Sequence, residues 1–454
     1  MLIAVTAASV DAVFLNERVD VVDPPAPQGR PRRRVRAALE KPPLLSVHVL
    51  RDNPVTVSSV AARERRNVYS SKRSEKTRDD VPHRVCEAGH VGASEIRIQR
   101  LLRWSRGGEA GPWSINIYPT NRCNFRCPIC WQRDPAYTPH YADEIPDARY
   151  LRLIDEAAEA KVCEWSILGG GEPMVRGDLI MEMCERIRRK DMYCYIQTNG
   201  SLFTESQLER FVDMGMNAVR VSLDGPNAAI NDAIRHESSF ERATANLKKL
   251  AEIKRRAHSK LPAVSIYMVL TSSTYDKLDQ MLEYAASVGA MEVEATTMVV
   301  HSEDARRFQL SEQQRAELPQ HLKRALERGG ELNIHNNFAL FYQDAITVDP
   351  NAMPGRKAGP DRGFFDAPCF EPWLNMTVLP NGRAGPCCMY DGEYTGDGGS
   401  IATSSLMGVW MGPYFQRLRA QALEGRLPRF CATCPSTLFA QQDALRGEAR
   451  TYVN

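Results

Sequence analysis

The sequence predicts an α/β protein, in which a partial (β/α)6 TIM-like barrel is followed by a small cysteine-rich domain made of a hairpin and a helix. Between residues 111 and 330, six short runs of β-branched and apolar residues alternate with amphipathic segments, which is typical of βα units around a parallel sheet. A closed eight-unit barrel takes about 250 residues, so six units predict a partial barrel. After residue 330 the alternation fades and cysteines recur.

The six predicted strands precede helical segments in a regular order. They span residues 114–118, 163–168, 193–197, 218–223, 263–270 and 291–296. Two of the helical segments place three apolar residues on one face, Leu151, Ile154 and Ala158 in one and Leu179, Met183 and Ile187 in the other. In barrels of this kind the chemistry lies at the carboxyl ends of the strands, and the motifs described below all fall there.

The remainder of the chain divides into three segments that differ in composition and residue pattern. Residues 1–110 are rich in Pro and Arg and show little apolar periodicity, which predicts a disordered basic extension. Residues 331–368 read as a linker or covering loop. Residues 369–454 hold a strand–turn–strand pattern with Asn381-Gly382 at the turn, a helix near 413–425, and cysteines that predict a metal centre in place of part of a core.

Composition excludes several classes of partner. The chain has 58 Lys and Arg against 56 Asp and Glu, a formal net charge of +2, which argues against a global field that attracts nucleic acid or anionic membrane. The arginines of the extension could form a nucleic-acid arm, but a solvated tail or a start codon assigned too far upstream explains them as well. No apolar run of about 18 residues occurs, and the apolar opening lacks a positive segment and a cleavage site, so we expect a cytoplasmic protein.

Three cysteines, Cys123, Cys127 and Cys130, lie in the short stretch YPTNRCNFRCPICWQR. Twelve cysteines in a chain without an export signal favour metal ligation over disulfides. Structural zinc sites use four ligands, whereas three thiolates can hold three corners of a [4Fe–4S] cube and leave one iron open to bind something else. A chance cluster or a partial zinc knuckle is the alternative.

With its spacing C-x3-C-x2-C, Ile129 in the hydrophobic position and Trp131 behind it, this loop resembles that of the radical S-adenosylmethionine (SAM) superfamily. The resemblance implies that the amino and carboxylate groups of SAM chelate the open iron. It further implies that one electron from the cluster cleaves SAM into methionine and a 5'-deoxyadenosyl radical, which abstracts a hydrogen atom from the substrate. An electron donor such as flavodoxin or ferredoxin is then expected as a partner.

Three further motifs follow strands two, three and four: LGGGEPMVR (168–176), QTNGSLF (197–203) and VSLDGPNAAINDAIR (221–235). Glycine runs and Asn-Gly or Asp-Gly pairs are turn signals in any protein, although a glycine run also lets the backbone approach a ligand closely. In this order they resemble the GGE, TNG and SLDG segments of the same superfamily, which implies SAM contacts by Gly170, Gly171, Glu172, Asn199, Ser222 and Arg235. A plain surface role for Arg235 is the alternative, and the faces of Tyr267, Glu294 and Thr296 are undetermined.

A second cysteine set, Cys369, Cys387, Cys431 and Cys434, has the pattern C-x12-G-x4-C followed by CxxC. Four thiolates form a closed set that would suit zinc equally well. The order of hairpin, helix and CxxC resembles the SPASM/twitch extensions of radical SAM enzymes, and no cysteine follows Cys434, which implies the shorter twitch-like form with one auxiliary [4Fe–4S] cluster. Cys388 could replace Cys387. The remaining cysteines, which lack ligand spacing, are Cys86, Cys163, Cys184 and Cys194.

The expected function is that of a radical SAM enzyme with two clusters. The leading hypothesis is a dehydrogenase-like tailoring oxidation of a small molecule, since auxiliary clusters in the family accompany two-electron oxidations. The alternative is a maturase of a ribosomal peptide or protein, through a cross-link, epimerisation or side-chain oxidation, although residues 1–110 do not read as a winged-helix peptide-binding domain. A zinc-stabilised nucleic-acid-binding protein is a distant third. The catalytic acid or base, the substrate and the oligomeric state are not assigned.

Overall fold

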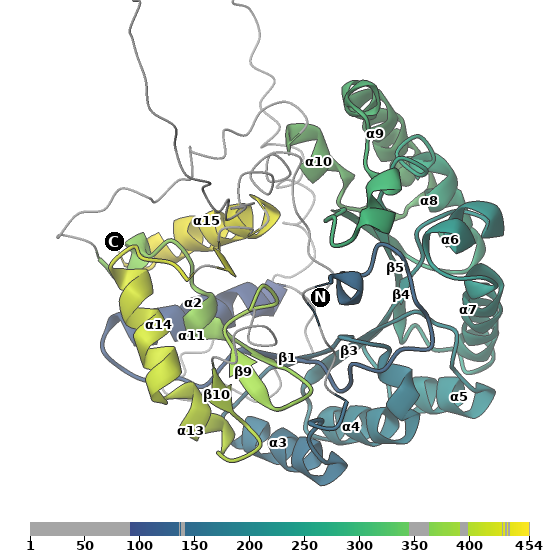
Figure 1. Ribbon diagram of the computed structural model, residues 1–454. Helices are drawn as coiled ribbons and strands as arrows, with labels where there is room; N and C mark the ends of the chain where they lie inside the picture. Colours follow the sequence, from purple (N-terminus) through teal and green to yellow (C-terminus); the bar gives the residue numbers. More distant parts are fainter. Residues whose placement is uncertain are drawn as a thin grey trace, which may run out of the picture. The chain divides into compact units, whose positions relative to one another are not determined.

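The computed structural model describes residues 91–135, 137, 141–344, 363–390, 398–428, 430, 431, 434 and 436–453 (Figure 1). Most of the predicted basic extension, together with Cys86, therefore lies outside the described residues. The described strands form one sheet in the order β10-β9-β8-β1-β2-β3-β4-β5-β6-β7. No helix among these residues is long and apolar enough to cross a membrane.

The six predicted strands are confirmed, and each begins at the predicted residue or one residue later. They are β1 (Ser114–Ile117), β2 (Glu164–Ile167), β3 (Tyr193–Thr198), β4 (Ala218–Ser222), β5 (Ala263–Leu270) and β6 (Glu292–Thr297). They pair in parallel in chain order, with Ile115 opposite Trp165 and Val221 opposite Ile266. The carboxyl ends of all six strands therefore meet at one edge of the sheet, as in a partial barrel.

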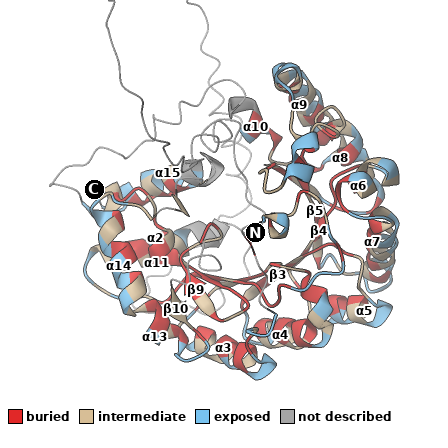
Figure 2. Cartoon of the chain, in the orientation of Figure 1, coloured by how far each residue is buried: buried red, intermediate tan, exposed pale blue. Residues whose placement is uncertain are grey.

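Helices cover one side of these strands. They are α3 (Asp147–Glu159), α4 (Gly177–Arg189), α5 (Glu205–Asp213), α6 (Ala228–Ile234), α7 (Ser239–Arg256), α8 (Leu278–Ser287) and α9 (Glu312–Leu332). Figure 1 shows them around the outer side of the sheet, and Figure 2 shows the buried residues on their faces toward it. The main core lies in this layer.

The predicted apolar face is confirmed for one helix and shifted for the other. Leu179, Met183 and Ile187 of α4 are buried. In α3 the buried face contains Tyr150, Leu153, Ile154 and Ala157, so the expected Leu151 and Ala158 lie at its edge and are only partly buried. Residues three and four apart share a helix face, so Tyr150, Leu153, Ile154 and Ala157 form one row toward the sheet.

The predicted hairpin is present and extends the barrel sheet. β8 (Asn375–Val378) and β9 (Arg383–Gly385) pair antiparallel across a turn in which Gly382 adopts a left-handed conformation, with φ +79°. β8 also pairs in parallel with β1, and β10 (Gly399–Ser400) adds to β9. The predicted helix is α14 (Pro413–Leu423). The other helices of this part are α11 (Glu371–Leu374), α13 (Leu406–Trp410) and α15 (Ser436–Arg450).

Two predicted boundaries are wrong. Residues 91–105, expected within the disordered extension, form helix α2, because Ile98 and Leu101 bury their side chains with Trp373 of α11. The expected linker from residue 331 instead begins with the end of α9, with β7 (His335–Asn336) paired to β6 and with α10 (Phe338–Asp344). Residues 345–362 lie outside the described part.

Candidate functional site

One cavity of about 370 Å³ lies at the carboxyl ends of the barrel strands. All nine residues that the sequence assigns to the first cluster and to SAM line it, namely Cys123, Cys127, Cys130, Gly170, Gly171, Glu172, Asn199, Ser222 and Arg235. These residues come from the loops after β1, β2 and β3, from the end of β4, and from the end of α6. The structure therefore brings together segments that are separated by more than a hundred residues in the chain.

The cysteine loop turns at its second and third thiols. The amide of Cys130 donates to the carbonyl oxygen of Cys127 at 3.1 Å, after which the short 3-10 helix Trp131–Arg133 begins. Burial raises the pKa of Cys123 to about 11 and that of Cys127 to about 12, and Arg235 opposes both shifts. A thiol with such a pKa stays protonated at neutral pH unless a metal replaces its proton.

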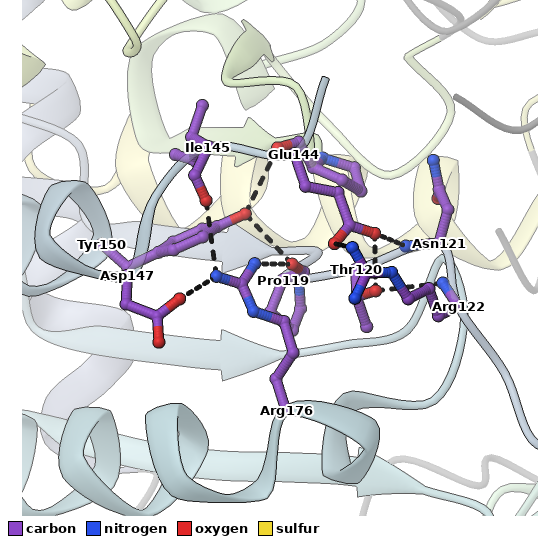
Figure 3. Close-up of polar contacts among 10 residues, drawn as sticks. Pro119, Thr120, Asn121, Arg122, Glu144, Ile145, Asp147, Tyr150 and Arg176 are labelled. Atoms are coloured by element: carbon purple, nitrogen blue, oxygen red, sulfur yellow. Dashed lines mark hydrogen bonds and ion pairs between the residues drawn. The ribbon is translucent and has the colours of Figure 1, made fainter. Parts of the chain in front are cut away.

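The start of this loop is held by Glu144, whose side chain is 6% exposed (Figure 3). Its Oε1 accepts from the Thr120 hydroxyl at 2.6 Å and from the Asn121 amide at 3.0 Å. Its Oε2 lies 3.3 Å from Nη2 of Arg122. Glu144 thereby fixes the residues directly before Cys123.

Arg176 and Tyr150 hold the same segment from the other side (Figure 3). Nη1 of Arg176 donates to the Pro119 carbonyl at 2.6 Å, and the same guanidinium forms an ion pair with Asp147. The Tyr150 hydroxyl donates to the Pro119 carbonyl at 3.2 Å. The sequence reasoning missed Glu144 and Tyr150, because neither belongs to a motif or has ligand spacing, and it gave no role to Arg176 at the end of the LGGGEPMVR segment.

The glycine run packs against the cysteine loop. The Gly171 amide donates to the Thr120 carbonyl and the Glu172 amide to the Arg122 carbonyl, both at 2.8 Å. A Cβ atom on Gly171 would clash with the backbone of Arg122, and one on Gly170 would clash with the Asn121 side chain. The glycines were expected to let the backbone approach a ligand, but in the structure their main effect is to let the two loops approach each other.

The carboxylate of Glu172 ties the second and third strand ends together. Glu172 is 2% exposed, and it accepts from the Thr198 hydroxyl at 2.6 Å, the Asn199 amide at 2.7 Å and the Met174 amide at 3.0 Å. Burial raises its pKa, and these hydrogen bonds oppose the rise. Nδ2 of Asn199 in turn donates to Oδ1 of Asn124 in the cysteine loop at 2.9 Å.

Arg235 is buried, so the surface alternative for it is wrong. Its Nε lies 2.7 Å from Oδ2 of Asp224, and the two side chains are 8% and 0% exposed. Burial disfavours the charge of Arg235, but Asp224 and Cys127 outweigh it and raise the pKa. Oδ1 of Asp224 accepts from the Val269 amide at 2.7 Å, which fixes the pair to β5. Arg235 thus presents a fixed positive charge beside the cysteine loop.

His301 also lines the cavity, and the sequence reasoning did not single it out. Burial lowers its pKa to about 4, although Asp134 opposes the shift. Its ring is therefore neutral at neutral pH and can accept a hydrogen bond. A lone histidine after a strand carries no spacing signal by which it could have been found.

The second cysteine set gathers near the hairpin. Burial raises the pKa of Cys369, Cys387 and Cys434, and electrostatic interactions link Cys369 to Cys431 and Cys434, and Cys387 to Cys369 and Cys431. Within the described residues, no group of three or more His, Cys, Asp or Glu side chains is placed to hold a single metal ion. Four partly buried thiols are nevertheless a donor set that suits an iron–sulfur cluster.

Cys388 also lies close to this set, since it interacts with Cys434 as well as with Tyr118 and Tyr267 inside the barrel. The choice between Cys387 and Cys388 as a ligand stays a prediction. Cys184 and Cys194 are fully buried, as expected of small apolar residues.

Two family models match the chain. The radical SAM superfamily matches residues 117–285, and the SPASM iron–sulfur cluster-binding domain matches residues 369–435. The first match contains the three-cysteine loop and the glycine, Asn199 and Arg235 segments. The second contains all the cysteines of the hairpin and of the CxxC turn.

Similar proteins include several enzymes that modify peptides or cofactors. PqqA peptide cyclase of Granulibacter bethesdensis is 27% identical over 71% of this chain and 79% of its own length. The tungsten-containing aldehyde ferredoxin oxidoreductase cofactor-modifying protein of Pyrococcus furiosus is 26% identical over 37% of this chain, and mycofactocin maturase MftC of Mycolicibacterium smegmatis is 28% identical over 42%. The chain spans about half the length of these last two, 47% and 46%.

Solved structures with a similar fold include Streptococcus suis SuiB, which has a TM-score of 0.54 and 15% identity over 81% of this chain and 79% of its own. SuiB bound to its precursor peptide SuiA gives 0.53, with 16% identity over 78% of this chain and 75% of its own. anSMEcpe with bound AdoMet and the Cp18Cys peptide gives 0.51, with 15% identity over 74% of this chain and 96% of its own. At these identities the likeness concerns the fold alone.

Proposed function

Because the chain belongs to the radical SAM superfamily and carries a SPASM-type iron–sulfur domain, we propose that it is a maturase that modifies a ribosomally made peptide or a protein. The observation that carries this proposal is the similarity to PqqA peptide cyclase, which extends over 71% of the chain. The similarity to mycofactocin maturase, 28% identical over 42% of the chain, also supports a maturase. Both similarities favour a maturase over the small-molecule oxidation that the paired clusters first suggested.

The cofactors of this family are a [4Fe–4S] cluster, SAM and an auxiliary cluster. We assign Cys123, Cys127 and Cys130 to the first cluster, and Cys369, Cys387, Cys431 and Cys434 to the auxiliary one. When bound, the first cluster supplies the electron that cleaves SAM into methionine and the radical that takes a hydrogen atom from the substrate. A flavodoxin or ferredoxin is the proposed electron donor.

The remaining residues of the cavity would bind and orient SAM. Arg235, fixed by Asp224, offers guanidinium donors to a carboxylate or ribose oxygen. Glu172 has three hydrogen bonds, two of them on Oε1, so Oε2 keeps one acceptor position for an ammonium group. The backbone of Gly170 and Gly171 and the side chains of Asn199 and Ser222 complete the proposed set.

A peptide encoded beside this gene is the substrate for the test. The reconstituted protein is incubated anaerobically with the peptide, SAM and dithionite, and the peptide is then examined by mass spectrometry. We expect deoxyadenosine together with a mass change or a new cross-link in the peptide. Deoxyadenosine without any change in the peptide, together with a change in a small-molecule substrate, would reject the maturase proposal.

Two variants test the two cysteine assignments separately. Cys127→Ala should abolish SAM cleavage, because the first cluster loses one of three ligands. Cys434→Ala should retain part of the SAM cleavage and form no modified peptide. Cys184→Ala is the control, because Cys184 is buried away from both sets. If both ligand variants cleaved SAM at the native rate, the assignment of the loop would be wrong.

A further inference from the structure

The inner face of the barrel strands is polar. Alternate side chains of a strand point to opposite faces, and in β3 and β4 the residues toward the helices are apolar and buried. The other face contributes Tyr195, Gln197, Arg220, Tyr267, Glu292 and Glu294. Barrel interiors are usually filled with packed branched apolar side chains, so this polar face is not a core.

The centre of this face is an ion pair that spans β5 and joins β4 to β6. Nη2 of Arg220 in β4 lies 2.8 Å from Oε1 of Glu294 in β6, and the two side chains remain 23% and 24% exposed. The guanidinium carbon lies 5.0 Å from the ring centre of Tyr195 and 5.7 Å from that of Tyr267. The tyrosines thus hold the guanidinium between them, where it attracts their rings.

This pair has unused hydrogen-bonding capacity. Nε of Arg220 is buried and has no hydrogen-bond partner among the described residues. The carboxylate of Glu292, which is half-buried beside the pair, makes no hydrogen bond or ion pair to another described residue, although its charge reaches Arg220. A buried donor without an acceptor is unfavourable, so a ligand that brings an acceptor to it is favoured.

The pair lies between the two cysteine sets. Arg220 is the register partner of Gln197, and Tyr267 is that of Ser222, and both Gln197 and Ser222 line the cavity of the first set. Tyr267 also interacts electrostatically with Cys388, the neighbour of Cys387 in the second set. A substrate that lies between the two proposed clusters therefore meets this face.

The charges on this polar face determine which kind of ligand it can bind. Two carboxylates, Glu292 and Glu294, stand beside one guanidinium, and Glu164 also acts on Tyr195, so the face has an excess of negative charge and repels an acidic side chain. Its free donor, Nε of Arg220, suits a neutral carbonyl oxygen. A peptide amide next to a basic side chain satisfies both groups.

We propose that Arg220, Glu292 and Glu294 form a substrate-recognition site, which takes a peptide segment through a backbone carbonyl on Arg220 and a basic side chain on Glu292. This inference rests on the proposed function and narrows its substrate class. In this proposal Glu292 selects for a positively charged side chain, whereas Arg220 binds the peptide backbone.

The test uses three synthetic peptides, acetyl-Gly-Gly-Xaa-Gly-Gly-amide with lysine, norleucine or glutamate at Xaa. Their dissociation constants for the reconstituted protein are measured by NMR titration with SAM present and reductant absent. We expect the lysine peptide to bind about tenfold tighter than the norleucine peptide, since one charge-assisted hydrogen bond separates them, and the glutamate peptide to bind most weakly.

Glu292→Gln should remove the preference for lysine and leave the affinity for the norleucine peptide unchanged. Arg220→Lys should weaken lysine and norleucine peptides alike, by about fivefold, because it keeps the charge and loses Nε. Arg328→Lys is the matched control, since Arg328 pairs with Glu283 on an exposed surface. Far-UV circular dichroism and iron content check that each variant is folded.

Equal affinity of the wild type for the lysine and norleucine peptides would overturn the proposal, as would a lysine preference that persists in Glu292→Gln. Failure of all three peptides to bind the wild type would overturn it as well. If Glu292→Gln does not fold, the comparison of peptides on the wild type still decides. A precursor peptide that is modified without any basic-residue requirement would sink this inference and leave the maturase proposal intact.

Discussion

Replacement of Glu144 should loosen the cysteine loop without touching a thiol. In Glu144→Ala, the Thr120 hydroxyl and the Asn121 amide lose their acceptor, and these two residues are 0% and 2% exposed. Each bond to a charged group contributes about 1.5–3 kcal/mol. Arg122 is 54% exposed, so its ion pair adds at most about 1 kcal/mol. Allowing for rearrangement, we expect a loss of about 3 kcal/mol in the free energy of unfolding.

The isosteric Glu144→Gln should cost less, about 1–2 kcal/mol, because an amide oxygen still accepts both bonds while the charge is lost. The assay is urea unfolding, combined with the rate at which a chelator removes iron from the reconstituted protein, which should rise from wild type to Gln to Ala. Asp147→Asn is the matched control, because Asp147 belongs to the same network but is 63% exposed. If Glu144→Ala lost no more stability or iron than Asp147→Asn, the positioning role of Glu144 would be refuted.

Three other perturbations have defined outcomes. Gly171→Ala should lower the free energy of unfolding by about 1–3 kcal/mol, because the added Cβ would clash with the backbone of Arg122. Its control is Gly330→Ala, which lies in open space within a helix and should raise the free energy of unfolding by up to about 1 kcal/mol. Both are measured in the same urea assay. For His301, burial lowers the pKa from 6.5 to about 4. Between pH 6.5 and about 4 the unfolded chain therefore binds a proton that the folded chain does not, and the free energy of unfolding falls as the pH is lowered across this range. His301→Gln should remove about 1 kcal/mol of that fall at pH 5.5, and identical pH profiles would contradict it. Arg419→Leu should lower the free energy of unfolding by about 3 kcal/mol, measured by thermal unfolding. The reason is that the buried guanidinium donates to two backbone carbonyls and stacks on two tryptophan rings. A loss below about 1 kcal/mol would contradict this.

The barrel strands could be read from the sequence because their signal is local. A run such as AVSIYMVL, residues 263–270, needs only its own β-branched and apolar residues to be recognised as a buried strand. The first site could be predicted as a group for a related reason. Once the strands are parallel, their carboxyl ends meet, so motifs that follow different strands must converge.

The parts that the sequence did not reveal depend on contacts between distant segments. β8 joins β1 across 261 positions, through bonds such as that from Nδ2 of Asn116 to the Thr377 hydroxyl at 3.2 Å. Helix α2 has apolar positions that acquire partners only in α11. Glu144 reaches the cysteine loop from a segment without a motif. No local pattern encodes such pairings, so strand type could be predicted but partner choice could not.

The inward orientation of Tyr267 and Glu294 was undetermined for the same reason, since alternation gives two faces and only the partner strands tell which one is inside. In the structure both residues lie on the polar inner face, and this face separates two cysteine sets with different electrostatic surroundings. Arg235 opposes the rise in the pKa of Cys123 and Cys127 in the first set, whereas Glu371 adds to the rise in the pKa of Cys369 and Cys434 in the second. Among the described residues, the groups that act on Cys369, Cys387 and Cys434 are thiols and Glu371, with no counterpart to Arg235. The two proposed clusters would therefore lie in different electrostatic surroundings, one beside an arginine and the other beside a glutamate.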